Sequence, residues 1–327
     1  MTANQNRYDF AWGNPYFLLD VLSKMYPSVR ATTNVGSLSY PPDEGIGEMV
    51  SATKQVIYKT TGFSYQHVAM TAGATQALSS ILKMYKLKGY DTVITSYNGY
   101  PYYEKMIEYS GLKRDARKIG FSLDTKFMSK SFILLDSPTN PEGDQFRLIK
   151  DGDQPIIWDN VYHNKIYSAN PSVFPEHDIV VSSYSKLLGV TGARLGFLAT
   201  NDKELFEQVL EVCNKDVATV SVPSQDLILD VLKTINIDEF LSKGSVHLSY
   251  NKEQFQRLEY LFENQPVPEV GMFYCVKPDQ KALDILGGCG IKYVNIKDKY
   301  IRLSLGQYND LTKEAVDQVL SKDKVRK

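Results

Sequence analysis

The chain has 327 residues, of which 43% are hydrophobic and 23% are charged, so it is long enough for one large globular domain and a smaller one. Its formal net charge of −1 gives no electrostatic reason to expect nucleic acid or an anionic membrane as a partner. Apolar runs are also too short to span a bilayer, and we expect a chain without a membrane segment.

The three cysteines and the N-terminal residues bear on where in the cell the protein is located. Cys213, Cys275 and Cys289 have neither close pairing nor metal-ligand spacing. The first nine residues are polar and lack the apolar core of a signal peptide. We therefore expect reduced thiols, no metal and a cytoplasmic location.

The N-terminal region is predicted to be an arm and two helices. Residues 10–20 suggest an extended arm that leads into a helix from about Phe17 to Met25. Turn-forming residues at 39–45 predict an irregular loop. A second helix is predicted from about Ile46 to Thr60, because its apolar positions roughly keep the 3.6-residue period.

Short apolar runs typical of buried strands then recur along the chain. They are residues 68–71, 91–95, 131–136, 156–159, 179–181 and 195–199. Helices are predicted after the first two runs, to about Tyr85 and Tyr109. Because polar residues gather just after the strand ends, the pattern predicts an α/β fold with a mostly parallel central sheet, helices on both faces and a ligand crevice at the carboxyl edge of the sheet.

The last third of the chain predicts a smaller α+β domain carried on a long helix. Helices are expected at 203–212, 224–234 and about 238–263, the last with a possible break near Gly244. Strands are expected at 271–276 and 300–305, with a glycine turn at 287–290 between them.

Lys186 lies just past the predicted strand 179–181, among small residues. Glycines at 189, 192 and 196 allow close approach of a backbone or a ligand. Ser183, Ser185 and Arg194 can all bind phosphate. A desolvated lysine beside a phosphate site suggests a Schiff-base lysine that holds pyridoxal 5′-phosphate (PLP). The alternative is a lysine that caps a strand and an arginine in a surface ion pair.

Other strand ends carry weaker signals. Residues 72–75 form a glycine turn before a helix, which favours an anion, although a helix cap explains Thr75 equally well. Tyr100 could stack on a planar cofactor or pack under a helix. Asp136 and Asp159 each close an apolar run, either as caps or facing a cation such as a protonated ring nitrogen.

Taken together and in order, these motifs resemble the class I/II aminotransferases of PLP fold type I, the aspartate aminotransferase-like family. The motifs are Gly73–Leu78, Asn140–Gly143, Asp159–Tyr162, Ser183–Arg194 and Arg302. The resemblance implies a large PLP-binding domain at 36–238, a small C-terminal domain at 239–327 and an N-terminal arm at 1–35 that joins the small domain. It also implies a homodimer whose active sites lie at the subunit interface.

The resemblance implies specific roles at the cofactor. Lys186 would form the Schiff base, Asp159 would pair with the ring nitrogen, and Tyr100 would stack on the ring. Tyr162 and Asn140 would bond the ring's 3-oxygen. The phosphate would be held by Gly73, Ala74, Thr75, Ser183, Ser185 and Arg194, and Tyr40 would reach the phosphate in the neighbouring subunit.

At the substrate, the resemblance assigns the α-carboxylate to Arg302. Asn140 would lie beside it, as would the N-terminal loop at Gly13 and Asn14. The side chain of the amino acid stays open, since no second cationic residue can be assigned to it. The count of 22 tyrosines permits an aromatic substrate without showing one.

The resemblance implies a transferase of amino-acid metabolism that moves an amino group from an L-amino acid to a 2-oxo acid. A PLP-dependent lyase or cyclase is the alternative, because it would use the same residues. A PLP-sensing regulator would carry a DNA-binding domain before the PLP domain, and only short, non-basic sequence precedes Phe10. An inactive scaffold would be expected to lack Lys186 or Asp159, and both are present.

Overall fold

The computed structural model describes residues 8–28, 38–97, 99–117, 130–143, 153–168 and 177–325. Residues 1–7 and 29–35 of the predicted N-terminal arm lie outside these ranges. Within them no helix is long and apolar enough to cross a membrane. No cluster of possible metal ligands occurs in the same described ranges. The cytoplasmic location stays a prediction.

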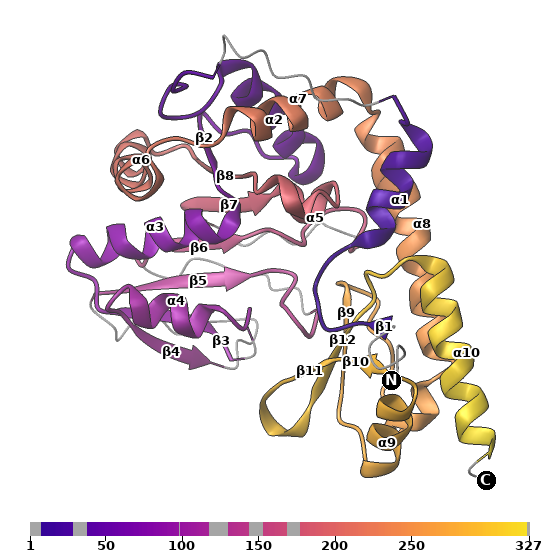
Figure 1. The fold of residues 1–327 in the computed structure, drawn as a ribbon. Coiled ribbons are helices and arrows are strands. Elements are labelled where there is room, and N and C mark those ends of the chain that lie inside the picture. Colours follow the sequence, from indigo (N-terminus) through magenta and orange to yellow (C-terminus); the bar gives the residue numbers. More distant parts are fainter. Residues whose placement is uncertain are drawn as a thin grey trace.

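A seven-stranded sheet forms the centre of the larger part of the molecule (Figure 1), in the order β2-β8-β7-β6-β5-β3-β4. Only β8 runs antiparallel to its neighbours, so the predicted mostly parallel sheet is confirmed. The strands are β2 (His67–Thr71), β3 (Thr92–Ser96), β4 (Lys113–Arg117), β5 (Ser131–Asp136), β6 (Ile156–Asp159), β7 (Ile179–Ser183) and β8 (Gly196–Thr200).

Both faces of this sheet are covered, which explains why its inner strands β5 to β8 are buried along their whole length. Successive residues of one strand enter different cores, since side chains alternate across a sheet. In β6, Ile157 packs with α3 (Ala74–Leu87), α4 (Tyr103–Tyr109) and α6 (Lys203–Val217). The next residue, Trp158, belongs to the opposite core with α2 (Gly47–Thr61) and α7 (Val222–Thr234). Because helices cover both faces, a ligand can reach the sheet only at the loops that follow the strand ends.

The C-terminal part forms a separate group of helices and strands beside the sheet (Figure 1). It contains α8 (Ile237–Gln256), a short 3-10 turn at Glu259–Phe262, α9 (Gln280–Gly288) and α10 (Asn309–Val325). Three strands, β9 (Phe273–Val276), β12 (Ile301–Ser304) and β11 (Val294–Asn295), make a small antiparallel sheet.

The described N-terminal residues join this C-terminal part. Strand β1 (Tyr8–Asp9) pairs in parallel with β10 (Ile291–Lys292). Helix α1 (Tyr16–Met25) then runs beside α8 (Figure 1). The course of these residues agrees with the predicted arm, while the residue limits of the predicted domains stay predictions.

Helix α8 differs from its prediction in two ways. It ends at Gln256, before the expected residue 263, and it continues unbroken through Gly244. A Cβ atom at position 244 would lie only 2.7 Å from Cδ2 of Leu18. The glycine therefore allows α1 to pack closely against α8, and it does not end the helix.

Candidate active site

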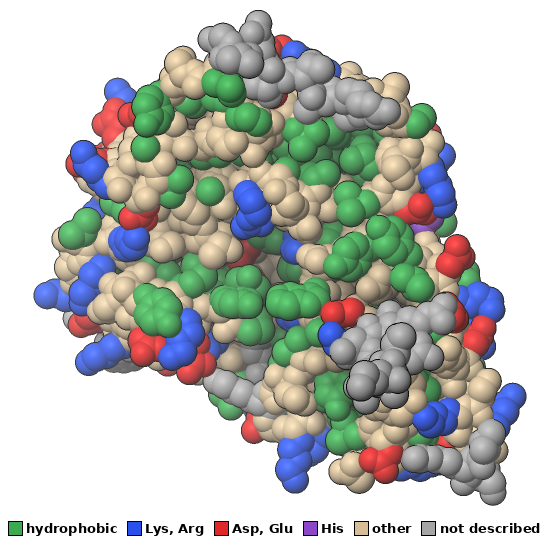
Figure 2. Space-filling view, in the orientation of Figure 1, with side chains coloured by type: hydrophobic (Ala, Val, Ile, Leu, Met, Phe, Trp, Pro, Cys, Tyr) green, Lys and Arg blue, Asp and Glu red, His purple; other side chains and the backbone are tan. Residues whose placement is uncertain are grey.

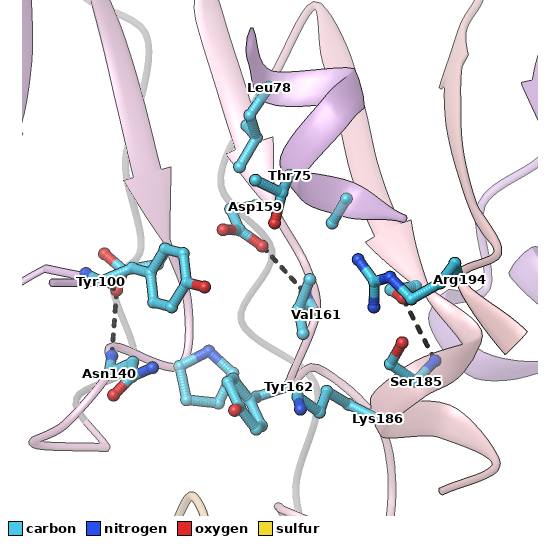
Figure 3. A pocket seen from close by; sticks show the side chains of 14 residues that line it. Thr75, Leu78, Tyr100, Asn140, Asp159, Val161, Tyr162, Ser185, Lys186 and Arg194 are labelled. Atoms are coloured by element: carbon cyan, nitrogen blue, oxygen red, sulfur yellow. Dashed lines mark hydrogen bonds between the residues drawn. The ribbon is translucent and has the colours of Figure 1, made fainter. Parts of the chain in front are cut away.

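A cavity of about 170 Å³ opens at the carboxyl ends of β5, β6 and β7, where the sequence predicted a crevice. The face that carries it is hollowed between the central sheet and the C-terminal part (Figure 2). Asp159, Tyr100, Lys186 and Arg194 come from different segments of the chain and surround this one space (Figure 3).

Lys186 enters the cavity from α5 (Tyr184–Leu187), a single helical turn directly after β7. Ser183 caps this turn, because its Oγ accepts a hydrogen bond from the Ser185 N–H at 3.2 Å. The Tyr167 hydroxyl donates to the Lys186 carbonyl at 2.7 Å and fixes the other end of the turn. Burial, followed by the charges of Arg194 and Arg302, lowers the pKa of Lys186 to about 8. Near neutral pH this amine therefore loses its proton far more readily than a surface lysine does.

Asp159 is the last residue of β6 and has only 7% of its surface exposed. It accepts hydrogen bonds from the Tyr103 hydroxyl at 2.7 Å and from the Val161 N–H at 3.2 Å. Burial is the main reason that its pKa rises to about 7, and the Tyr103 hydrogen bond opposes this rise. Both of these hydrogen-bond donors are neutral, so a cation placed against Asp159 would stabilise its ionised form.

The start of α3 forms an anion site on another wall. Ala74 and Thr75 are the first two residues of α3 and line the cavity, and the first N–H groups of a helix have no partner within it. Gly73 has φ +84°, and a Cβ there would lie 2.9 Å from the Arg194 guanidinium. The Ser185 Oγ is buried without a hydrogen-bond partner. Free donors and a positive charge thus converge where a phosphate could bind.

Arg302, on β12, lies next to the cavity without lining it and has 8% of its surface exposed. Its Nη1 donates to Asn140 Oδ1 at 3.0 Å and its Nη2 to the Ala11 carbonyl at 3.1 Å. The guanidinium lies 4.3 Å from the centre of the Phe273 ring. Its buried Nε has no hydrogen-bond partner. An aromatic support and an unused donor are what an arginine needs to bind a carboxylate.

The comparisons with known proteins decide the family. The family model described as aminotransferase class I and II matches residues 1–265. The chain belongs to this family. The match covers most of the chain, and it confirms the resemblance drawn from the motifs.

The aminotransferase has relatives of known name and structure. A probable N-acetyl-LL-diaminopimelate aminotransferase of Bacillus subtilis is 25% identical over 86% of this chain and 80% of its own. The aspartate/prephenate aminotransferase of Thermus thermophilus is 23% identical over 67% of this chain and 63% of its own. An aromatic aminotransferase of Pyrococcus horikoshii superposes with a TM-score of 0.75 over 98% of this chain and 96% of its own, at 18% identity. These neighbours confirm fold type I. Because the relatives named are all aminotransferases, the alternative of a lyase or cyclase finds no support.

The structure brings most of the predicted site residues of this aminotransferase together. Those that line the cavity are Ala74, Thr75, Tyr100, Asn140, Asp159, Tyr162, Ser183, Ser185, Lys186 and Arg194. Gly73 adjoins Arg194, and a Cβ on Gly13 would lie 3.2 Å from the Tyr162 hydroxyl. The Asn14 amide donates to the Tyr16 hydroxyl at 2.9 Å. Tyr40 is 84% exposed and does not line the cavity of its own chain. The roles of these residues stay predictions.

Several side chains of the site were missed or left undecided at the level of the sequence. Tyr103 donates a hydrogen bond to Asp159, and the only signal in the sequence was its place in the tyrosine-rich segment that follows β3. Asp136 lines the cavity as well, although a capping role was the simpler interpretation. Phe273 lies under Arg302 through tertiary packing, for which no local pattern exists.

The residues present fit PLP, the cofactor of this family. The cofactor carries a phosphate, an aldehyde and a ring nitrogen that accepts a proton. The cavity contains a group that suits each of them. The unpartnered Ser185 Oγ suits the phosphate, the amine of Lys186 with its lowered pKa suits the aldehyde, and the buried Asp159 carboxylate suits the ring nitrogen. Each chemical feature of the cofactor thus has a matching group in the cavity.

Proposed function

We propose that the protein uses PLP at Lys186 to move an amino group from an L-amino acid to a 2-oxo acid. The observation that carries the proposal is the pairing of Lys186 and Asp159 in one cavity. Burial lowers the pKa of the amine to about 8 and raises the pKa of the carboxyl to about 7. Perturbed groups of this kind, facing one buried space, are typical of a catalytic site.

The proposal assigns three walls of the cavity to the cofactor. The phosphate would be held by the start of α3 together with Ser183, Ser185 and Arg194. Asp159 would keep the ring nitrogen protonated, while Asn140 and Tyr162 would bond the ring's 3-oxygen. Tyr100 would lie on the ring face, supported by its hydrogen bond with Thr75.

When bound, PLP withdraws electrons from the Cα of the amino acid and so makes its proton removable. Lys186 is the base that takes this proton and returns it as an acid. A pKa of about 8 suits both tasks near neutral pH. General acid–base catalysis of this kind contributes roughly 10²–10⁴-fold to a rate.

Arg302 would bind the α-carboxylate of the substrate through parallel hydrogen bonds. Its contacts with Asn140 and Ala11 hold the guanidinium in place, and Phe273 excludes water from one of its faces. A fixed carboxylate fixes the direction of the bonds at Cα. This orientation selects loss of the Cα proton over loss of carbon dioxide.

A homodimer is part of the same proposal. Tyr40 is an aromatic side chain with 84% of its surface exposed, and the cavity of its own chain does not include it. An exposed tyrosine of this kind is suited to a protein interface. In the dimer, Tyr40 would reach the phosphate site of the partner subunit.

The proposal is tested by trapping the cofactor. Protein incubated with PLP is reduced with borohydride, digested and analysed by mass spectrometry, and the adduct is expected on Lys186. Lys252 is the matched control, because burial also lowers its pKa to about 8, yet it lies outside the cavity. An adduct that persists in Lys186→Ala, or that is found on Lys252, would refute the proposal. Conversion of an amino acid to its 2-oxo acid only in the presence of a 2-oxo-acid acceptor then identifies transfer.

A further inference from the structure

Two carboxylates lie side by side at the floor of the aminotransferase cavity. Asp136 ends β5, Asp159 ends β6, and the two residues are direct partners in the parallel register of these strands. Asp136 has only 4% of its surface exposed and lines the same cavity. The roles proposed above use Asp159 alone, so the second buried carboxylate is unexplained.

Asp136 connects two walls of the cavity. Its Oδ2 accepts hydrogen bonds from the Asn140 N–H at 2.9 Å and from the Tyr100 N–H at 3.2 Å. Its Oδ1 accepts from the Ser96 hydroxyl at 2.8 Å. Asn140 in turn accepts from Arg302. One carboxylate therefore anchors the loop after β3, the loop after β5 and, through Asn140, the arginine of β12.

The loop after β3 is shaped around this anchor. A Cβ on Gly99 would lie 2.6 Å from the Ser96 Oγ and 3.3 Å from Asp136 Oδ1. Only a residue without a side chain allows the loop to close over both groups. The backbone N–H of Tyr100 can then reach the carboxylate.

The charge of Asp136 also faces Asp159. The other titratable groups near Asp159 are Tyr103 of α4, Tyr100 of the loop after β3, and Tyr162, while Lys186 and Arg194 are the cations that line the cavity. The three hydrogen-bond donors named for Asp136 are neutral. Like charges held side by side in a buried place each disfavour the other's ionisation.

We propose that Asp136 is a positioning residue, which ties the Tyr100 and Asn140 walls of the cavity together and whose negative charge opposes that of Asp159. The consequence of this charge for the cofactor rests on the proposed function. Two neighbouring carboxylates make this end of the cavity favour a cation more strongly than one carboxylate does. The pair therefore strengthens the preference for a protonated ring nitrogen beside Asp159.

Asp136→Asn separates the charge from the hydrogen bonds. The amide oxygen can accept from both N–H groups, and the amide nitrogen can donate to the Ser96 oxygen. The network keeps its shape and loses its charge. Asp136→Ala removes both, and Ser96→Ala is the matched control that removes one donor but keeps the charge.

The first measurement uses cofactor-free protein and follows the unfolding equilibrium from pH 5 to pH 8. Buried carboxyls with raised pKa stabilise the fold below their unfolded pKa of roughly 3.9, and this stability is lost as the pH rises through the folded pKa. For Asp159 that folded pKa is about 7, and Asp136 contributes to it. As the pH rises from 5 to 8, the folding equilibrium constant is expected to fall about tenfold less in Asp136→Asn than in the wild type. This difference is equivalent to about one pKa unit. A curve parallel to that of the wild type would overturn the charge role, and Ser96→Ala is expected not to show this difference.

The second measurement is the dissociation constant of PLP at pH 7. Asp136→Asn loses only the charge and is expected to weaken binding by about threefold, whereas Asp136→Ala also frees the two loops that Asp136 holds and is expected to weaken binding by about tenfold or more. Equal losses in both variants would overturn the positioning role. If Asp136→Ala does not fold, the PLP dissociation constant of Ser96→Ala takes its place, because this variant removes one of the bonds that position Asp136; unchanged affinity in Ser96→Ala would overturn the positioning role. A wild type that fails to bind PLP would refute the proposed function, while the cofactor-free curve would still test Asp136.

Discussion

The two sides of the active site are built in different ways. On the sheet side, Asp136 and Asp159 end two neighbouring buried strands in direct register, and Lys186 lies in the helical turn that follows a third strand. On the opposite side, Arg302 meets Ala11 and Asn140, which are 291 and 162 positions away along the chain. The sheet side is thus fixed by local structure, and the opposite side by the assembly of distant segments.

Loss of Lys186 should give the largest effect on the sheet side. Lys186→Ala is expected to lower kcat by more than about 10³-fold, since it removes both the attachment point and the base that we propose for the reaction. The fold should survive, because the side chain faces the cavity. Single-turnover kinetics and circular dichroism check the two parts. Turnover near the wild-type rate would show that another residue does this work.

Arg302→Ala tests the opposite side of the active site, which distant segments assemble. It is expected to raise KM for the amino acid by roughly 100-fold, in line with loss of a charge-assisted pair worth about 3 kcal/mol. The dissociation constant of PLP should change much less, because Arg302 does not line the cavity proposed for the cofactor. Arg302→Lys is the control, since it keeps the charge but not the two parallel donors. An unchanged KM in the alanine variant would remove the carboxylate role.

Gly244→Ala probes the packing that places the arm. A Cβ there would press on Leu18 of α1 and also on Ile166, whose nearest atom is 3.1 Å away. We expect a loss of about 1–3 kcal/mol in the free energy of unfolding. Gly287→Ala is the matched control in α9, where a Cβ meets nothing within 4 Å, and it should stabilise by about 0.5–1 kcal/mol. Equal effects on the melting temperature would contradict the role of Gly244.

The smallest effect is expected from Tyr103→Phe, which changes one hydrogen bond on the sheet side. This bond lowers the pKa of Asp159, so its removal should raise that pKa further above about 7. As the pH falls, Asp159 then becomes protonated at a higher pH than in the wild type. The acid limb of PLP affinity should move to higher pH by up to about one unit. Tyr109→Phe, at an exposed position of the same helix, should leave the profile in place.

The same contrast explains which features could be predicted from the sequence. The central strands are short apolar runs followed by polar residues, so their positions and the cavity at their ends follow from local pattern. Strand β4 was missed, because its residues Lys113–Arg117 are charged except for Ala116 and it lies at the edge of the sheet. Helices α9 and α10 were missed as well, and two glycines at the end of α9 were taken as part of a turn.

The contacts of the assembled side depend on information that local patterns do not hold. Nothing near Phe273 in the sequence shows that its ring lies under Arg302. Gly244 suggested a helix break because a lone glycine weakens a helix, and only its contact with Leu18 shows the packing reason. Arg302 itself could be assigned through the family resemblance and not through its neighbours.

The bond between Ala11 and Arg302 has a consequence for the order in which the protein is made. During translation Ala11 emerges before the strands of the central sheet, whereas β12 emerges after them. The central sheet, complete by Thr200, can form well before that moment. A nascent chain could thus form the loops around the cavity before Arg302 is able to reach them.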